Sequence, residues 1–238
     1  MRVQVAVALI AVFTTPAFGG EVYFNDFNAA PGTSYPEWTS TGYTNSANRA
    51  GTVAAGSGPQ VVAILESPNG KERFLGEFGG PAILTGRPFD PQHFVRMDET
   101  VTLTLRKLKP HTTATVTFDL YILKSWDGNN PNYGPDRWDL SVHCGPTLLD
   151  TTFSNNPKTA AYDLSLQNYP AADSAQQTGA AAVNTLGYKF YGDSIYRLSF
   201  TFAHTGETLA LNFSSSLFEG KGIADESWGL DNVRVSTP

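Results

Sequence analysis

The chain has 238 residues, of which 16% are charged, and its formal net charge is −6. Its densest basic cluster is Arg106, Lys107 and Lys109, which argues against a nucleic-acid partner because such binding depends on Lys and Arg contacts to phosphate. A single cysteine rules out an internal disulfide, and the length suits one domain that buries its core without covalent staples.

Residues 1–19 have the layout of a secretory signal peptide. A positive charge precedes a short apolar run, and residues 17–19 form a cleavage site of the small-x-small kind. The apolar run is shorter than the roughly 20 residues that span a bilayer, so we expect no transmembrane span. We predict a secreted protein, extracellular or at the cell surface, cleaved near Gly19 and folded as a single domain over residues 20–238. The alternative is that the apolar run is a buried N-terminal strand.

The rest of the chain shows the two-residue hydrophobic period of half-buried β-strands. In chain order, this alternation marks residues 21–27, 101–106, 115–122, 137–142, 196–202, 209–213 and 231–235. Polar stretches at residues 28–60, 125–136 and 155–185 break the period, and we interpret them as long loops of the kind that often bind ligands. Strands with one apolar face pack as two layers. We therefore predict an all-β fold, a two-sheet antiparallel β-sandwich of the jelly-roll kind.

Two carboxylates occupy unexpected positions in the first and last strands. Asp231 has the parity of Val233 and Val235, and Asp26 has the parity of Val22 and Phe24. If these strands are neighbours, the two acids converge, and a buried pair of carboxylates needs a proton, a base or a metal ion. Calcium, which prefers hard oxygen ligands, fits best. The alternative is a bulge at Asp231-Asn232 that leaves Asp231 a solvated turn residue.

The loop at residues 125–136 is a second candidate cation site. Its oxygen-bearing side chains include Asp127, Asn129 and Asp136, and the absence of sulfur and imidazole favours Ca²⁺ over zinc or copper. Glu226, in another polar loop, could complete either metal site. The alternative is an ordinary turn cluster of Asn, Gly and Pro.

Aromatic side chains in the polar loops suggest a platform for sugar rings. Trp126, Tyr133 and Trp228 flank the acidic residues, and Trp38 lies in the first long loop. The alternative is that these rings cover the ends of the sandwich core. Trp138 shares the parity of Leu140 and Val142, so we interpret it as structural.

The sequence contains no recognisable catalytic motif. It lacks HExxH, GxSxG and a P-loop, and no strand spacing places an acid and a base together. Cys144 has the inward parity of Val142, which predicts a buried, unreactive thiol. We therefore expect no catalytic residues.

Four segments carry a family resemblance: FDLYILKSWDG (118–128), GPDRWDLSV (134–142), YRLSFTFAHTGETLALNFSS (196–215) and DESWGLDNVRV (225–235). Together they resemble secreted bacterial β-sandwich domains, both those of exosortase-sorted (PEP-CTERM-type) surface proteins and calcium-binding carbohydrate-binding modules. The resemblance implies that Asp26 and Asp231 share a structural calcium ion.

These observations lead to one hypothesis with two alternatives. The leading hypothesis is a secreted, non-catalytic, calcium-stabilised β-sandwich that binds a glycan or another extracellular or cell-surface polymer. The first alternative is a structural surface or adhesion protein with no small ligand. The second is a jelly-roll polysaccharide hydrolase or lyase.

Overall fold

Twelve β-strands provide the regular structure of the part of the chain that the computed structural model describes, namely residues 20–29, 33, 35–41, 64–79, 97–156, 165–189, 191–218, 223 and 225–238. The strands are β1 (Gly20–Asn25), β2 (Trp38–Ser40), β3 (Ile64–Glu66), β4 (Arg73–Phe78), β5 (Met97–Arg106), β6 (Thr113–Lys124), β7 (Arg137–Val142), β8 (Thr147–Thr152), β9 (Ala182–Val183), β10 (Asp193–Ala203), β11 (Thr208–Leu217) and β12 (Glu226–Thr237). Across these ranges, no helix has the length and apolar character needed to span a membrane. The expected signal peptide, residues 1–19, lies outside the described residues.

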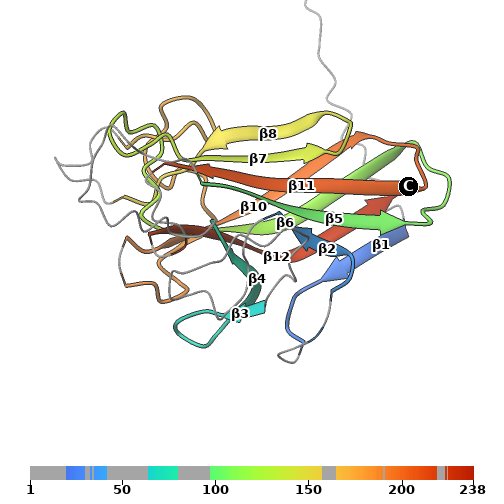
Figure 1. Ribbon diagram of the computed structural model, residues 1–238, viewed down its shortest axis with the longest axis horizontal. Helices are drawn as coiled ribbons and strands as arrows, with labels where there is room; N and C mark the ends of the chain where they lie inside the picture. Colours follow the sequence, from blue (N-terminus) through green and yellow to red (C-terminus); the bar gives the residue numbers. More distant parts are fainter. Residues whose placement is uncertain are drawn as a thin grey trace, which may run out of the picture.

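The strands form two antiparallel sheets stacked as layers (Figure 1). One has the order β3-β4-β12-β6-β10-β9, with β1 also paired to β12, and the other has the order β2-β5-β11-β7-β8. Strands β4-β12-β6-β10 and β5-β11-β7-β8 form the eight-stranded framework of a jelly roll, in which the chain changes sheet at every step except the β7–β8 hairpin. The predicted two-sheet sandwich is confirmed.

The alternating apolar side chains of both sheets meet in one interior. Along β6 the inward residues are Val116, Phe118, Leu120 and Ile122, all buried. Phe118 meets Phe213 of the other sheet edge-on, with ring centroids 5.3 Å apart. Trp138 meets Trp228 in the same way at 5.9 Å. The parity of Trp138 thus predicted its place in the core correctly.

A smaller apolar cluster lies on the opposite, outer face of the seven-stranded sheet. It consists of Leu65, Phe74, Tyr121, Leu123 and Leu186. Asn69, in the β3–β4 turn, donates its backbone N–H to the Leu186 carbonyl and its side-chain amide to the Thr185 carbonyl, which fastens the two covering segments together. This cover leaves exposed the part of the outer face that carries Arg197 and Arg234.

The prediction of a buried Cys144 is wrong. The alternation of β7 ends at Val142, and Cys144 lies in the following turn with a φ of 57°. The turn directs its thiol to the surface, where it is exposed and free.

Candidate metal centre

Three buried carboxylates converge beside the start of β12. Asp127 and Asp136 belong to the loop between β6 and β7, and Glu226 is the first residue of β12. Because Glu226 lies opposite Lys124, the last residue of β6, the β6–β12 ladder places the start of β12 next to this loop. One carboxylate oxygen from each residue lies within 4.8 Å of the others, and the exposed fractions of the three residues are 4%, 0% and 3%. The structure thus brings together three of the residues predicted as metal ligands.

Hydrogen bonds from backbone N–H groups fix the β6–β7 loop around Asp136. The Asp136 carboxylate accepts the N–H of Asp127 through Oδ2 and the N–H of Phe218, at 3.3 Å, through Oδ1. The Asp136 N–H donates in turn to the Gly128 carbonyl at 2.9 Å. Gly128 has a φ of +58°, and a Cβ added there would clash with the Leu166 carbonyl, so the turn requires glycine. The loop therefore holds Asp127 and Asp136 in a fixed relation.

Glu226 carries an electrostatic penalty in this group. Its burial and then the negative charge of Asp136 raise the pKa of its carboxyl well above the ordinary value. Lys124 does not compensate for this, because its Nζ donates to Glu77 at 2.5 Å and to the Ile223 carbonyl. A hydrogen bond with the Asp136 carboxyl also helps to raise the pKa of Glu226. The Oε1 atom of Glu226 is buried and has no hydrogen-bond partner among the residues that the structure describes. Without a cation, we expect Glu226 to keep its proton well above the pH at which an ordinary glutamic acid ionises.

The Asn156 amide adds a neutral group beside the carboxylates. Its Nδ2 contacts Oδ1 of Asp127, and its own Oδ1 is buried with no partner among the described side chains and backbone. A half-turn of the amide would direct its oxygen toward the Asp127 carboxylate, an arrangement that is favourable only with a cation between them. The sequence interpretation missed this residue, whose only signal is the polar pair Asn155-Asn156 immediately after a strand.

This donor set fits calcium. Asp127, Asp136, Glu226 and Asn156 would hold the ion, and all of them offer hard oxygen atoms, which calcium takes in sets of six to eight at roughly 2.3–2.6 Å. Oxygens that lie within 4.8 Å of one another can meet on one such ion. Glycoside hydrolysis at the same carboxylates is ruled out by their burial, because a polysaccharide cannot reach them.

Asn129, the remaining predicted ligand of this loop, points to other partners. Its Oδ1 accepts a hydrogen bond from Thr152 at 2.6 Å, and its Nδ2 donates to Asn168 at 2.7 Å. These bonds tie the loop to β8 and to the segment at residues 165–189, so Asn129 has a bridging role in the structure.

A bulge in β12 overturns the predicted orientation of Asp231. The register shifts between Asp231 and Arg234, with Asn232 at a φ of 51°. Val233 therefore faces the interior, whereas Oδ2 of Asp231 accepts the hydroxyl of Tyr121, at 2.9 Å, on the outer face. The bulge that we considered as an alternative exists, but Asp231 is buried and not solvated.

Asp26 is also placed differently from the prediction. β1 pairs with β12 as expected, but its register shifts between Glu21 and Tyr23, so that Phe24 is exposed. The Asp26 carboxylate accepts the N–H of Asn28 at 3.2 Å, as in a turn. Among the described residues, neither Asp26 nor Asp231 belongs to a group of three acidic, histidine or cysteine ligands within 4.8 Å. The structure gives no support to an ion shared by these two acids.

Asp231→Asn is expected to flatten the pH dependence of thermal stability. Burial raises the pKa of Asp231 to about 7, so the folded state binds a proton that the unfolded state has released. This contribution to stability is fully present below about pH 4 and is lost as the pH rises through 7. Melting curves between these limits should show a fall of several degrees in the wild type and a smaller fall in the variant. The exposed Asp150→Asn control should keep the wild-type profile; a D231N profile that also matches it would contradict this assignment.

The three tryptophans predicted as a contact surface are core residues. Trp126 and Trp228 are fully buried and Trp38 is 3% exposed, so they cannot stack on a glycan. The Trp126 indole donates to the Ser227 carbonyl at 2.8 Å, and that of Trp38 donates to the Tyr23 hydroxyl at 2.7 Å. The alternative interpretation, in which these rings cover the core, describes them correctly. Tyr133 is half-buried.

Comparisons with other proteins find distant structural likenesses. No family model and no curated protein matches it. Similar solved structures include TmCBM27, a carbohydrate-binding module described for mannan recognition, with 13% identity and a TM-score of 0.39 over 92% of this chain and 98% of that one. The K3 adhesin domain of Lys-gingipain from Porphyromonas gingivalis has 13% identity and a TM-score of 0.37, over 92% of this chain and 100% of that one. The CBM6 of the laminarinase LamC from Zobellia galactanivorans has 9% identity and a TM-score of 0.32, over 74% of this chain and 88% of that one.

All three TM-scores lie below 0.5, so these likenesses carry no argument about this chain. The resemblance to exosortase-sorted proteins stays a prediction.

Proposed function

We propose that the protein is a secreted, non-catalytic β-sandwich that is stabilised by one calcium ion and binds a glycan. The observation that carries the calcium part is the buried group of Asp127, Asp136 and Glu226, in which Glu226 Oε1 has no hydrogen-bond partner within the described part of the chain. Three carboxylates at this spacing repel one another unless protons or a cation neutralise them. A divalent cation removes the repulsion and uses the free oxygen.

The oxygen donor set favours calcium over other metals. Zinc and copper prefer imidazole or thiolate ligands, which this group lacks. Magnesium usually keeps several waters and rarely occupies a site built wholly of protein groups. Bound calcium would tie the β6–β7 loop to the start of β12, and its role would be structural.

Calcium binding should be stronger at high pH than at low pH. The raised pKa of Glu226 means that the free protein holds a proton at this carboxyl, and the ion can bind only after that proton leaves. Calorimetric titration of chelator-treated protein is expected to give one calcium ion per chain, with higher affinity at pH 8 than at pH 5. Titration in buffers of different ionisation enthalpy should reveal the released proton. Calcium binding that is independent of pH would count against this site.

The glycan part of the proposal is tested on the calcium-loaded protein. Binding on a glycan array without release of reducing sugar from the same polysaccharides supports a non-catalytic binding module. An array without hits, combined with self-assembly, would favour a structural surface protein. Release of sugar would favour an enzyme.

A further inference from the structure

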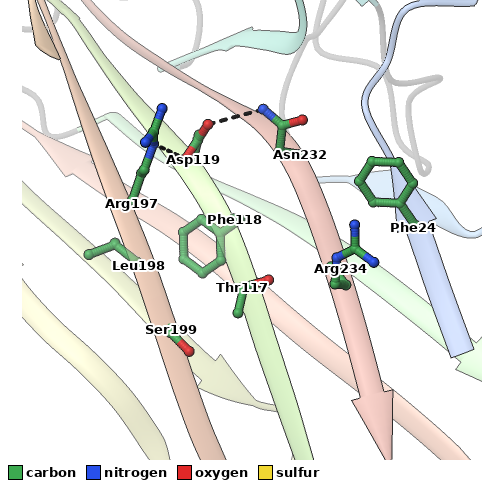
Figure 2. A pocket seen from close by; sticks show the side chains of 9 residues that line it. All are labelled: Phe24, Thr117, Phe118, Asp119, Arg197, Leu198, Ser199, Asn232 and Arg234. Atoms are coloured by element: carbon green, nitrogen blue, oxygen red, sulfur yellow. Dashed lines mark hydrogen bonds and ion pairs between the residues drawn. The ribbon is translucent and has the colours of Figure 1, made fainter. Parts of the chain in front are cut away.

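A groove of about 400 Å³ crosses the open part of the outer face of the seven-stranded sheet (Figure 2). It runs over β1, β12, β6 and β10, beyond the apolar cluster that covers the other part of this face. Its volume lies within the range of small-ligand sites, roughly 300–1,000 Å³. The groove is separate from the three carboxylates of the metal centre, none of which lines it.

One row of side chains follows the strand register across the floor of the groove. Phe24 of β1 pairs with Arg234, Arg234 with Thr117, and Thr117 with Ser199. Residues directly opposite on neighbouring strands project from the same face of a sheet. An aromatic ring, a guanidinium group and two hydroxyls therefore stand in line over four strands that are distant in the sequence.

A second row lies beside the first. Asp119 accepts a hydrogen bond from the Asn232 amide at 3.0 Å and forms an ion pair with Arg197 at 3.6 Å (Figure 2). This row offers a carboxylate acceptor next to amide and guanidinium donors. Because each sugar hydroxyl both donates and accepts, such neighbouring donors and acceptors suit vicinal hydroxyl groups.

The charges of the groove are balanced within the protein. Arg197 is paired with Asp119, and Arg234 forms an ion pair with Glu21 of β1. An ionic ligand would have to compete with one of these pairs, whereas an uncharged ligand adds hydrogen bonds without separating them. The balance therefore favours a neutral ligand.

Phe24 supplies an exposed aromatic surface to this groove, which Phe118 and Leu198 also line. Phe24 is 44% exposed, although the Arg234 guanidinium lies over its ring at 4.4 Å from the centroid. A half-exposed aromatic ring next to paired hydrogen-bonding groups matches a sugar ring, which has both apolar C–H faces and hydroxyl edges.

We infer that this groove is the glycan site and that it takes a neutral pyranose oligosaccharide, with Phe24 stacked on a ring and the Asp119–Arg197 pair bound to its hydroxyls. This inference rests on the proposed glycan-binding function. It is independent of the calcium site.

The test is calorimetric titration of the calcium-loaded full chain with four hexasaccharides: mannohexaose, cellohexaose, laminarihexaose and the acidic hexagalacturonate. Phe24→Ala and Arg197→Ala are each expected to weaken binding of the best neutral ligand about tenfold, the usual effect of losing one buried stacking or charged hydrogen-bonding contact. Tyr191→Ala, which removes an aromatic ring of similar exposure (40%) elsewhere, should leave affinity unchanged. Arg137→Ala, which removes an exposed ion pair on the other sheet, should also leave it unchanged.

The possible outcomes separate this inference from the function on which it rests. Glycan binding that F24A and R197A leave intact would overturn the groove assignment while the proposed function stands. Preference for hexagalacturonate would overturn the neutral ligand class. Failure of the wild type to bind any of these sugars, or any other glycan on an array, would overturn the proposed function and this inference with it.

Discussion

The melting temperature of the chelator-treated protein is expected to rise by roughly 5–10 °C when calcium is added at about a hundred times its dissociation constant. At that concentration a ligand that binds only the folded state contributes about 2.7 kcal/mol, and each kcal/mol raises the melting temperature of a domain of this size by roughly 2–4 °C. Glu226→Gln is expected to abolish most of this rise. The substitution keeps the shape of the side chain but removes the charge that the ion requires.

The same variant separates metal binding from a purely structural role. Without calcium, Glu226→Gln should be at least as stable as the wild type at pH 8, because on folding the wild type must then either take up a proton at Glu226 or bury its charge, both of which cost free energy. Protonated Glu226 contributes to the stability of the folded wild type at low pH, and this contribution is lost as the pH rises through the raised pKa of Glu226. Asp150→Asn, an equal change at an exposed carboxylate, should keep the full response to calcium. An equal calcium response in E226Q and the wild type would place the ion elsewhere.

The sequence was most informative where a local rule applies to every residue of a segment. Strict alternation along β6, β10 and β11 predicted which side chains face the interior, because one face of each strand packs against the other sheet. The oxygen-rich composition of residues 125–136 also predicted a candidate cation loop, and Asp127, Asp136 and Glu226 do lie together. Composition alone could not choose between Asn129 and Asn156, because that choice depends on contacts with β8 and residues 165–189.

Single-residue bulges explain the errors in the two terminal strands. The parity argument for Asp231 fails because Asn232 adopts a positive φ and adds a residue to β12. Asn tolerates this conformation better than most residues, so Asp231-Asn232 was a signal for the bulge but not a decisive one. The shift between Glu21 and Tyr23 in β1 has the same effect and exposes Phe24.

The groove was beyond the reach of the sequence for another reason. Its two rows depend on the register of four strands whose residues range from Phe24 to Arg234. The alternation does predict that Thr117 and Arg197 face away from the core, but not that they lie on adjacent strands. The tryptophans illustrate the converse, since polar flanking residues suggested exposure and tertiary packing buried the rings.

Trp228→Ala is expected to destabilise the fold by about 3–5 kcal/mol, the usual cost of deleting a large buried aromatic side chain. The Trp228 ring is fully buried and packs against Phe78 at 4.7 Å and Trp138 at 5.9 Å, so its removal leaves a cavity between the sheets. Denaturant unfolding with saturating calcium measures this loss without the contribution of an unoccupied metal site.

Trp228→Phe is the matched variant, and it should cost much less than Trp228→Ala. Phenylalanine keeps most of the aromatic packing, and in the described ranges the indole Nε1 of Trp228 has no hydrogen-bond partner whose loss would add to the cost. If Trp228 is a core residue, stability should fall in W228A and largely survive in W228F, while the folded fraction of both variants should keep the glycan affinity of the wild type. A W228A protein with wild-type stability and no glycan binding would instead show that the ring contacts ligand, and it would reverse the assignment of the binding face to the groove at Phe24.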